Sequence, residues 1–177
     1  MSSITMLSIG TIDYIVARLL FHNSFPFHAI NMGSQSLEKC LKSFIMEKRS
    51  LTDKEIKRKY GHDLKKLFDN CKVIKPLFSK NVRLEAIIDN YDEGHNFRYS
   101  DDSIKALEKI KNNKGFLQHR EKIDFIWNSW LQDLDYAFYS IIQIIGKTPT
   151  VLLDIEKGEH PVWKEILYRD NLEFRNI

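Results

Sequence analysis

The chain has 177 residues, of which 43% are hydrophobic and 29% are charged, and its formal net charge is +3 at neutral pH. These values predict one globular domain with a single sizeable core, and they exclude a disordered chain or a strongly basic nucleic-acid-binding domain. The two cysteines, Cys40 and Cys71, make neither a disulfide framework nor a metal-binding signature, which fits a reduced, cytoplasmic setting.

Two long helices are predicted at the start of the chain, over residues 4–21 and 26–48. In both, apolar residues recur at the three-and-four spacing of a helix, and the second begins with a proline, which suits a first helical turn. Small residues cluster in the middle of the second helix, at Gly33, Ser34 and Ser36. They indicate the close approach of a neighbouring helix, and a nick that admits a ligand is the other interpretation.

Three shorter helices follow, over residues 52–61, 63–74 and 82–91. Thr52 and Glu55 have the spacing of a capping box at the start of the first of them, where a hydroxyl and a carboxylate satisfy backbone N–H groups. Each of the three has apolar residues on one side, so each is expected to pack on a common core.

The second half of the chain contains the strongest periodic signal. A short helix is predicted over residues 101–114, and then residues 123–145 keep apolar and aromatic side chains at helical spacing. We expect a long core helix there and not a base-stacking surface, because the aromatic residues alternate with aliphatic ones. Beyond Gly146, residues 148–153 are compatible with an extended segment and residues 159–170 with a terminal helix.

No alternating pattern is long enough to build a sheet, so we predict an all-α, up-and-down helical bundle. Residues 1–146 form the bundle, and residues 147–177 form a short C-terminal appendage that packs on the bundle or on a partner. No membrane span is expected. Asp13 and Arg18 interrupt the first apolar stretch, and the late stretch over residues 137–146 is too short to cross a bilayer.

A motif in several parts lies on the second helix and beyond it. Its residues, in chain order, are Gln35, Glu38-Lys39, Leu41-Lys42, His62-Asp63-Leu64 and Arg98-Tyr99. In this order and spacing the chain resembles the HEPN family, named for nucleotide binding in higher eukaryotes and prokaryotes. The resemblance covers about residues 9–145. It implies a small helical bundle in which His-Asp-Leu opens a helix, and it suggests a homodimer.

The resemblance also implies one kind of chemistry. Ribonucleases of this family carry an arginine that holds the scissile phosphate and, four to six residues later, a histidine that moves the proton of the ribose 2′-hydroxyl, without a metal. Here Arg58 and His62 have three residues between them and are the candidate catalytic pair. Arg18 and His22 have the same short spacing. No metal-ligand spacing and no glycine-rich phosphate loop occurs, so neither a metal nor a cofactor is predicted.

Five residues are candidates for ligand binding: His62, Asp63, Arg98, Tyr99 and Lys39. The backbone N–H groups at the start of the helix after His62 would form a natural phosphate site, and Arg98 would add positive charge. A structural interpretation stands beside this one, in which His62 or Asp63 caps that helix.

Three functions fit the sequence. The first is a non-catalytic or regulatory module that binds a nucleotide, nucleic acid or protein partner. The second is a metal-independent ribonuclease of the toxin or antiviral-defence type, with a variant site at Arg58 and His62. The third is a structural partner of a nucleotidyltransferase, a pairing that the family resemblance suggests.

Overall fold

The computed structural model describes residues 1–93 and 120–174, and within these residues the chain is helical without any strand. The all-α bundle is thus confirmed, whereas the helix expected over residues 101–114 lies outside the described residues. The helices are α1 (Ser3–His22), α2 (Pro26–Arg49), α3 (Asp53–Tyr60), α4 (Leu64–Ile74), α5 (Leu77–Lys80), α6 (Val82–Glu93), α8 (Arg120–Ile145), α9 (Thr150–Glu156) and α10 (Pro161–Tyr168).

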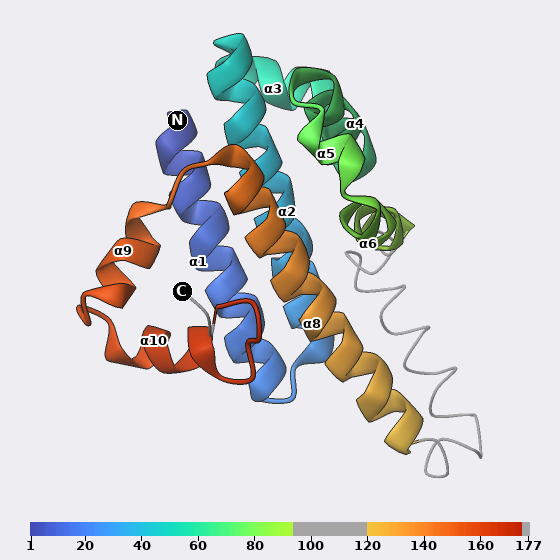
Figure 1. Ribbon diagram of the computed structural model, residues 1–177, viewed down its shortest axis with the longest axis vertical. Coiled ribbons are helices and arrows are strands. Elements are labelled where there is room, and N and C mark those ends of the chain that lie inside the picture. The colour runs from blue at the N-terminus through green and yellow to red at the C-terminus, as the bar shows by residue number, and fades with distance from the viewer. Residues whose placement is uncertain (94–119, 175–177) are drawn as a thin grey trace.

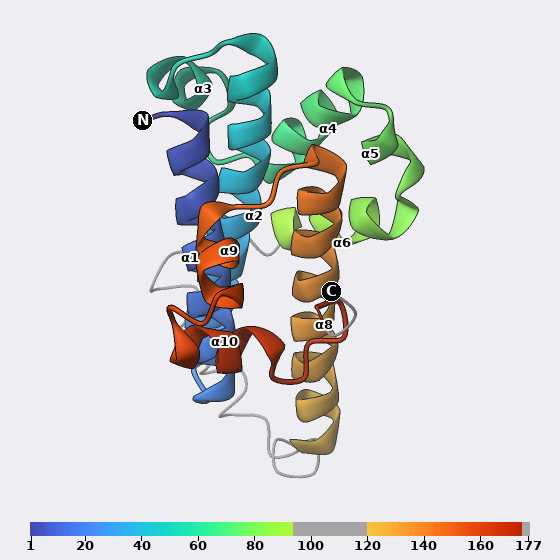
Figure 2. The ribbon, with the colours of Figure 1, turned by 60° about the vertical axis from the view of Figure 1, so that its left-hand side comes forward.

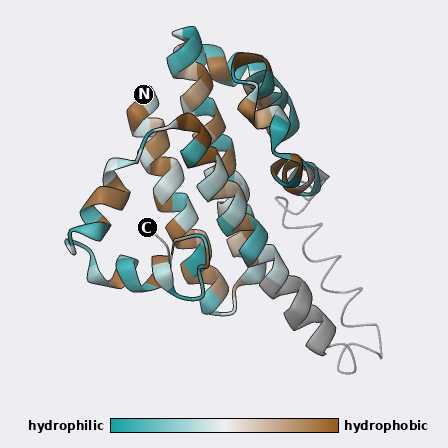
Figure 3. Ribbon diagram, viewed as in Figure 1, coloured by the Kyte–Doolittle hydropathy of each residue, from teal (hydrophilic) through white to brown (hydrophobic). Residues whose placement is uncertain are grey.

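The three long helices α1, α2 and α8 pack against one another and form the centre of the bundle (Figure 1). Helices α4, α5 and α6 lie on one side of this centre, and α9 and α10 lie on the other. Hydrophobic and hydrophilic residues alternate along the helices (Figure 3), so each helix has an apolar side to bury.

Local sequence signals explain where several helices begin. The Ser2 side chain accepts a hydrogen bond from the Thr5 N–H (3.1 Å) at the start of α1, and Pro26 occupies the first turn of α2. At the start of α3, the Thr52 N–H donates to the Glu55 carboxylate (2.8 Å) and completes the predicted capping box. These contacts satisfy backbone groups that would otherwise be left without partners.

Small residues let the central helices approach closely, as the sequence predicted. A Cβ atom at Gly33 on α2 would lie 3.1 Å from a methyl carbon of Leu134 on α8. On α1, a Cβ atom at Gly10 would lie 3.1 Å from the Cys40 sulfur and 3.2 Å from the backbone oxygen of Ser36. The cluster of small residues is therefore a helix contact.

Substituting Gly10 with valine tests this close approach. The branched side chain would push against the backbone of α2, and we expect the free energy of unfolding to fall by about 1–3 kcal/mol, measured by urea denaturation. Ala86→Val is the control, because Ala86 is exposed on α6 and should lose only about 0.5 kcal/mol of helix preference. Equal losses in the two variants would contradict the close approach of α1 and α2.

Helix α5 was not predicted, since Lys75-Pro76 indicated only the end of the preceding helix. That end is correct, because α4 stops at Ile74. The chain then makes one short helix that buries Phe78 completely. The Phe78 ring lies 5.4 Å from the Phe44 ring and 5.8 Å from the Phe68 ring, so one aromatic anchor holds this turn in place.

The long helix α8 is a core helix, as predicted. Leu134, Phe138 and Ile141 on this helix are completely buried. The Phe138 ring stacks on the Tyr14 ring of α1, with 3.9 Å between centroids. The Phe138 ring therefore serves core packing.

The expectation of an extended segment over residues 148–153 is wrong. Residues Thr150–Glu156 form α9, which follows Pro149 and buries Leu152 and Ile155 on one side. A short apolar run does not distinguish a strand from a buried helix. Leu152 and Ile155 are three residues apart, which is the spacing of one helical face. The terminal helix was predicted correctly and appears as α10.

Helices α9 and α10 pack against α1 (Figure 2), and a buried arginine reinforces this contact. Arg18 on α1 has no exposed surface. Its Nε donates to the backbone oxygen of Ile166 (2.9 Å), and its terminal nitrogens donate to the backbone oxygen of Arg169 and to the Asp135 carboxylate on α8. One guanidinium thus joins the C-terminal segment to two central helices.

Two further side chains complete this polar group. The Tyr14 hydroxyl donates to Asp135 (2.6 Å), and the Asn171 amide donates to the same hydroxyl (2.8 Å). Burial raises the pKa of Asp135 and of Tyr14, in part against the positive charge of Arg18. We refer to Arg18, Asp135, Tyr14 and Asn171 as the Arg18 cluster.

Among the described helices, α1 alone is long and apolar enough to cross a membrane by length and composition. Its packing accounts for this hydropathy, because half of the apolar stretch is buried inside the bundle. The helix also carries Arg18 and Tyr14, whose polar atoms are bonded within the Arg18 cluster. Core packing is therefore sufficient to explain the apolar character of α1.

Candidate functional site

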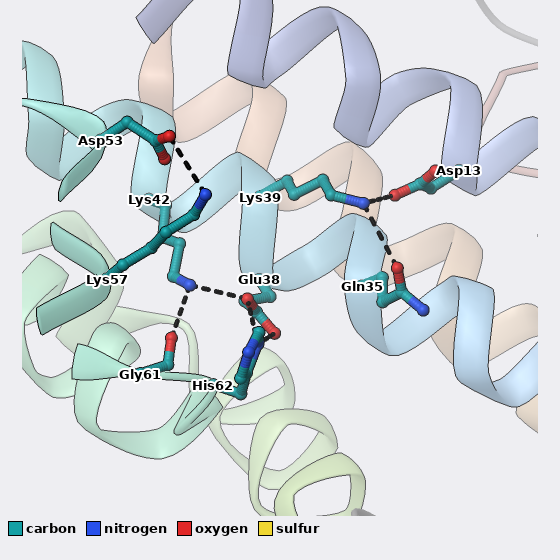
Figure 4. Close-up of polar contacts among 9 residues, drawn as sticks. All are labelled: Asp13, Gln35, Glu38, Lys39, Lys42, Asp53, Lys57, Gly61 and His62. Carbon is teal, nitrogen blue, oxygen red and sulfur yellow. Dashed lines mark hydrogen bonds and ion pairs between the residues drawn. The ribbon is translucent and has the colours of Figure 1, made fainter. Parts of the chain in front are cut away.

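The polar residues of the motif on α2 point in two directions (Figure 4). Gln35 and Lys39 face α1, whereas Glu38 and Lys42 face the turn between α3 and α4. One helix thereby places two separate polar groups, each with partners from another part of the chain.

The first polar group joins α1 and α2. The Lys39 ammonium pairs with the Asp13 carboxylate and lies 3.4 Å from the side-chain oxygen of Gln35. Burial raises the pKa of Asp13, although the charge of Lys39 opposes this shift. Lys39, a predicted ligand-binding residue, therefore holds a partly buried carboxylate within the bundle.

The second polar group joins α2 to the turn after α3. The Lys42 ammonium donates to the Glu38 carboxylate (2.7 Å) and to the backbone oxygen of Gly61 (2.5 Å). Both charged side chains are almost fully buried, with exposed fractions of 3% for Lys42 and 7% for Glu38. The pair fixes the turn that follows α3, because it ties the Gly61 carbonyl to α2.

His62 is held by the same carboxylate. Its Nδ1 atom lies 3.0 Å from one oxygen of Glu38 and 3.3 Å from the other, while 72% of the imidazole side chain is exposed. A carboxylate at one ring nitrogen orients an imidazole and selects its tautomer. The structure thus places an oriented, accessible histidine at the surface.

Arg58 and His62 do not share one helical face. Arg58 is exposed on α3, whose last residue is Tyr60, and the chain then turns at Gly61 with a positive φ of 56°. The end of this helix at Gly61 agrees with the sequence prediction. The two candidate catalytic residues are therefore positioned by different parts of the backbone.

Asp63 caps α4. Its carboxylate accepts a hydrogen bond from the Lys66 N–H (2.7 Å) and occupies one of the donors that a phosphate would need. The structural interpretation of the His-Asp pair thus accounts for Asp63. The other two predicted ligand-binding residues, Arg98 and Tyr99, lie outside the described residues.

The capping role of Asp63 is testable by substitution. Asp63→Ala is expected to lower the free energy of unfolding by about 1 kcal/mol, because the Lys66 N–H loses its acceptor. Asp63→Ser is the control, since a serine hydroxyl caps a helix nearly as well. If both variants unfold at the same denaturant concentration as the parent chain, the capping contact does not stabilise the fold.

Exposed cations lie on both helices that flank His62. The Lys59 and Lys66 ammonium groups lie 5.4 and 5.9 Å from the centre of the Tyr60 ring. Arg58 and Lys54 are also exposed on α3. We call the surface formed by Lys54, Arg58, Lys59, His62 and Lys66 the basic end.

The acids interleaved with these cations are engaged at helix starts. Glu55 belongs to the capping box of α3, where hydrogen bonds from Thr52 lower its pKa. Asp53 pairs with Lys57 (3.1 Å), and Asp63 caps α4. The acids therefore offset the positive charge only in part, because residues 53–66 contain six lysine and arginine residues and three acids.

The other short arginine–histidine pair is unavailable for a ligand, since Arg18 is fully buried in the Arg18 cluster. The two cysteines are buried as well, and burial raises the pKa of Cys40 to about 12. In residues 1–93 and 120–174, no group of three or more histidine, cysteine, aspartate or glutamate side chains is arranged to hold a metal ion.

Comparison with known families agrees with the motif. The profile of the HEPN domain matches residues 5–122, which is more than half of the chain. The chain belongs to the HEPN family. No curated protein and no solved structure matches it. The match begins on α1 and ends near the start of α8, so the C-terminal segment with α9 and α10 lies outside it.

Sequence reasoning missed the most specific contact of this HEPN chain, between Glu38 and His62. The signal available was the placement of Glu38 and Lys42 one helical turn apart, which indicates an ion pair. No local pattern indicated that this pair would be buried, or that the turn at Gly61 would bring a histidine 24 positions away onto the same carboxylate.

Proposed function

We propose that this HEPN domain is a non-catalytic module that binds single-stranded RNA through the basic end. The observation that carries this proposal is that the two helices flanking the exposed His62 carry four exposed cations, two of which lie over the same Tyr60 ring. Exposed lysine and arginine side chains from two helices suit a phosphate backbone, whose charge they neutralise without reading sequence.

The arrangement of the arginine and histidine candidates supports binding over cleavage. In-line attack requires a phosphate-binding arginine and a proton-transferring histidine at a fixed distance. Arg58 is separated from His62 by the turn at Gly61, and Arg18 is buried. Within the described residues of a single chain, no arginine and histidine stand together on one exposed helical face.

A ribonuclease is the second candidate, and one observation favours it. The Nδ1 atom of His62 is held by Glu38 at 3.0 Å while most of the ring faces solvent. Carboxylate-oriented histidines of this kind act as general bases in hydrolytic sites. A homodimer, as the resemblance suggests, could bring Arg58 of one chain towards His62 of the other.

One experiment separates the two candidates. Labelled single-stranded RNA is incubated with the full chain in excess chelator and run on native and denaturing gels, with His62→Ala alongside. We expect intact RNA with a slower native mobility in both proteins. Cleavage that survives the chelator and disappears in His62→Ala would identify the ribonuclease instead. RNA that is both intact and unshifted would refute binding.

The affinity of this complex should depend steeply on salt. With about four phosphate contacts, the affinity is expected to fall roughly 50-fold between about 50 and 200 mM salt, measured by fluorescence anisotropy. Replacing Lys59 and Lys66 with alanine should reduce the logarithmic salt slope by about 1.4, because each phosphate contact on a single strand contributes about 0.7.

The control for the salt experiment is Lys147→Ala. Lys147 is also exposed but lies just after α8, where it pairs with Glu47 (2.6 Å). Lys147→Ala should leave the salt slope of the RNA affinity unchanged. An equal effect of Lys147→Ala and of the double substitution would show that the RNA does not bind at the basic end.

A further inference from the structure

A second surface of the molecule, away from the basic end, combines exposed hydrophobic residues with positive charge. The link between α5 and α6 and the C-terminal half of α8 border a shallow, open groove of about 440 Å³. The groove is lined by Leu77, Lys80, Asn81, Val82, Arg83, Tyr136 and Ile144. Large exposed hydrophobic groups at a concave site mark interaction surfaces more often than single exposed residues do.

Two apolar side chains of this groove are exposed to solvent. Val82 is 75% exposed and Leu77 is 49% exposed, and both line the same hollow beside Tyr136 and Ile144. Apolar surface of this kind gains free energy when a partner covers it, at about 25 cal/mol for each Å² removed from water.

The walls of the groove are already fixed in position. The Asn81 side-chain oxygen accepts hydrogen bonds from the Leu84 N–H (3.0 Å) and from the Tyr136 hydroxyl (2.9 Å). The Arg83 guanidinium lies over the Tyr136 ring, 4.0 Å from its centre. These contacts link α6 to α8, so a partner would not need to order the groove on binding.

The charge around the groove selects the chemistry of the partner. Lys80 and Arg83 are exposed at its rim, and Asp133 offsets one of these charges from 3.3 Å. Lys75 lies nearby and donates to the backbone oxygen of Ile144. A partner that places hydrophobic side chains in the hollow and carboxylates at the rim would match both features.

We propose that this groove binds an amphipathic helix of a partner protein, with apolar residues on one face and acidic residues on its flanks. Such helices bind in grooves through apolar residues spaced three and four apart. This proposal is independent of RNA binding, because the groove shares no residue with the basic end.

The test uses the full chain, labelled for NMR, and two synthetic helical peptides with leucine at the same positions. One peptide carries glutamate at all flanking positions and the other carries lysine. We expect saturable binding of the acidic peptide, with a Kd in the micromolar range. The largest shift changes are expected in residues 77–83 and 136–144, and the basic peptide should bind at least about tenfold more weakly.

A matched pair of variants locates the site. Val82→Glu should weaken the binding of the acidic peptide at least about tenfold, because it places a negative charge in the groove that repels the glutamates of the peptide. Val162→Glu is the control. Val162 is 64% exposed on α10, and both valines lie in the first turn of a helix, where glutamate is tolerated. RNA binding should be unchanged in both variants.

Several results would overturn the proposal. Absence of saturable binding by the acidic peptide would do so, as would equal binding of the two peptides or shift changes that lie outside the groove. Co-sedimentation with vesicles of anionic lipid that is lost in Val82→Glu would assign the groove to a membrane surface. A change in RNA affinity in Val82→Glu would show that the two surfaces are not separate.

Discussion

Replacing Arg18 with methionine is expected to lower the free energy of unfolding by about 3–5 kcal/mol, one of the largest effects of any single substitution in this chain. The methionine fills a similar volume but leaves Asp135, which is 1% exposed, as a buried carboxylate without its cation. The backbone oxygens of Ile166 and Arg169 lose a donor as well. Chemical denaturation of the two proteins measures the difference.

Arg83→Met is the matched control. Arg83 also pairs with an aspartate of α8, Asp133, but the two side chains are 53% and 39% exposed. An exposed pair of this kind contributes about 0–1 kcal/mol. If Arg18→Met costs no more than Arg83→Met, the Arg18 cluster does not hold the fold together.

A double variant separates the charge from the packing. With Asp135→Leu added to Arg18→Met, no buried charge is left unpaired, and part of the lost stability should return. The Tyr14 hydroxyl would lose its Asp135 acceptor in the double variant, so the recovery is expected to be incomplete. Limited proteolysis should cut the segment after α8 faster in Arg18→Met than in the parent chain, because Arg18 anchors that segment.

The sequence predicted those features of the fold that depend on neighbouring residues. The helix starts at Thr52 and Asp63 follow from side chains that lie within one turn of the backbone groups they satisfy. The start at Pro26 follows from a proline, which needs no N–H partner in a first turn. The core side of α8 follows from a spacing that repeats over many turns. Such signals are local, so they can be read without knowing the fold.

The features that were missed depend on contacts far apart in the chain. Arg18 is buried against partners at Ile166 and Asp135, which are 148 and 117 positions away in the chain. Its burial therefore could not be predicted from neighbouring residues. Helix α5 exists because one buried ring, that of Phe78, holds a single turn, and a four-residue helix has no periodicity to detect. In α9, an apolar run was compatible with strand or helix until its neighbours were known.

The same division applies to the candidate site. The motif on α2 and the His-Asp pair indicated the family, which the HEPN match confirmed. Their roles inside the molecule could not be predicted, because charged residues on a helix normally face solvent. Glu38 and Lys42 are buried instead, and they hold the turn that presents His62.

Substituting Lys42 with methionine is the second change with a large expected effect. The substitution removes the ammonium group that pairs with the buried Glu38 carboxylate, whereas the contact of Glu38 with His62 is kept. It also removes the donor to the Gly61 carbonyl. We expect the free energy of unfolding to fall by about 3 kcal/mol, measured by urea denaturation. Lys57→Met is the control, because Lys57 and Asp53 have the same four-residue spacing in an exposed pair worth at most about 0.5 kcal/mol. Similar losses in both variants would contradict the structural role of the buried pair.

The Glu38 carboxylate also connects stability to function, which makes Glu38→Gln informative. A glutamine keeps the volume and an oxygen acceptor but removes the charge that orients the imidazole. If the basic end only binds RNA, folded Glu38→Gln should bind with unchanged affinity, because Glu38 is buried away from the phosphates. If His62 were a general base, Glu38→Gln should slow cleavage while affinity stays the same. Anisotropy and gel cleavage on one preparation therefore distinguish an imidazole that is held for catalysis from one that is held as part of a folded turn.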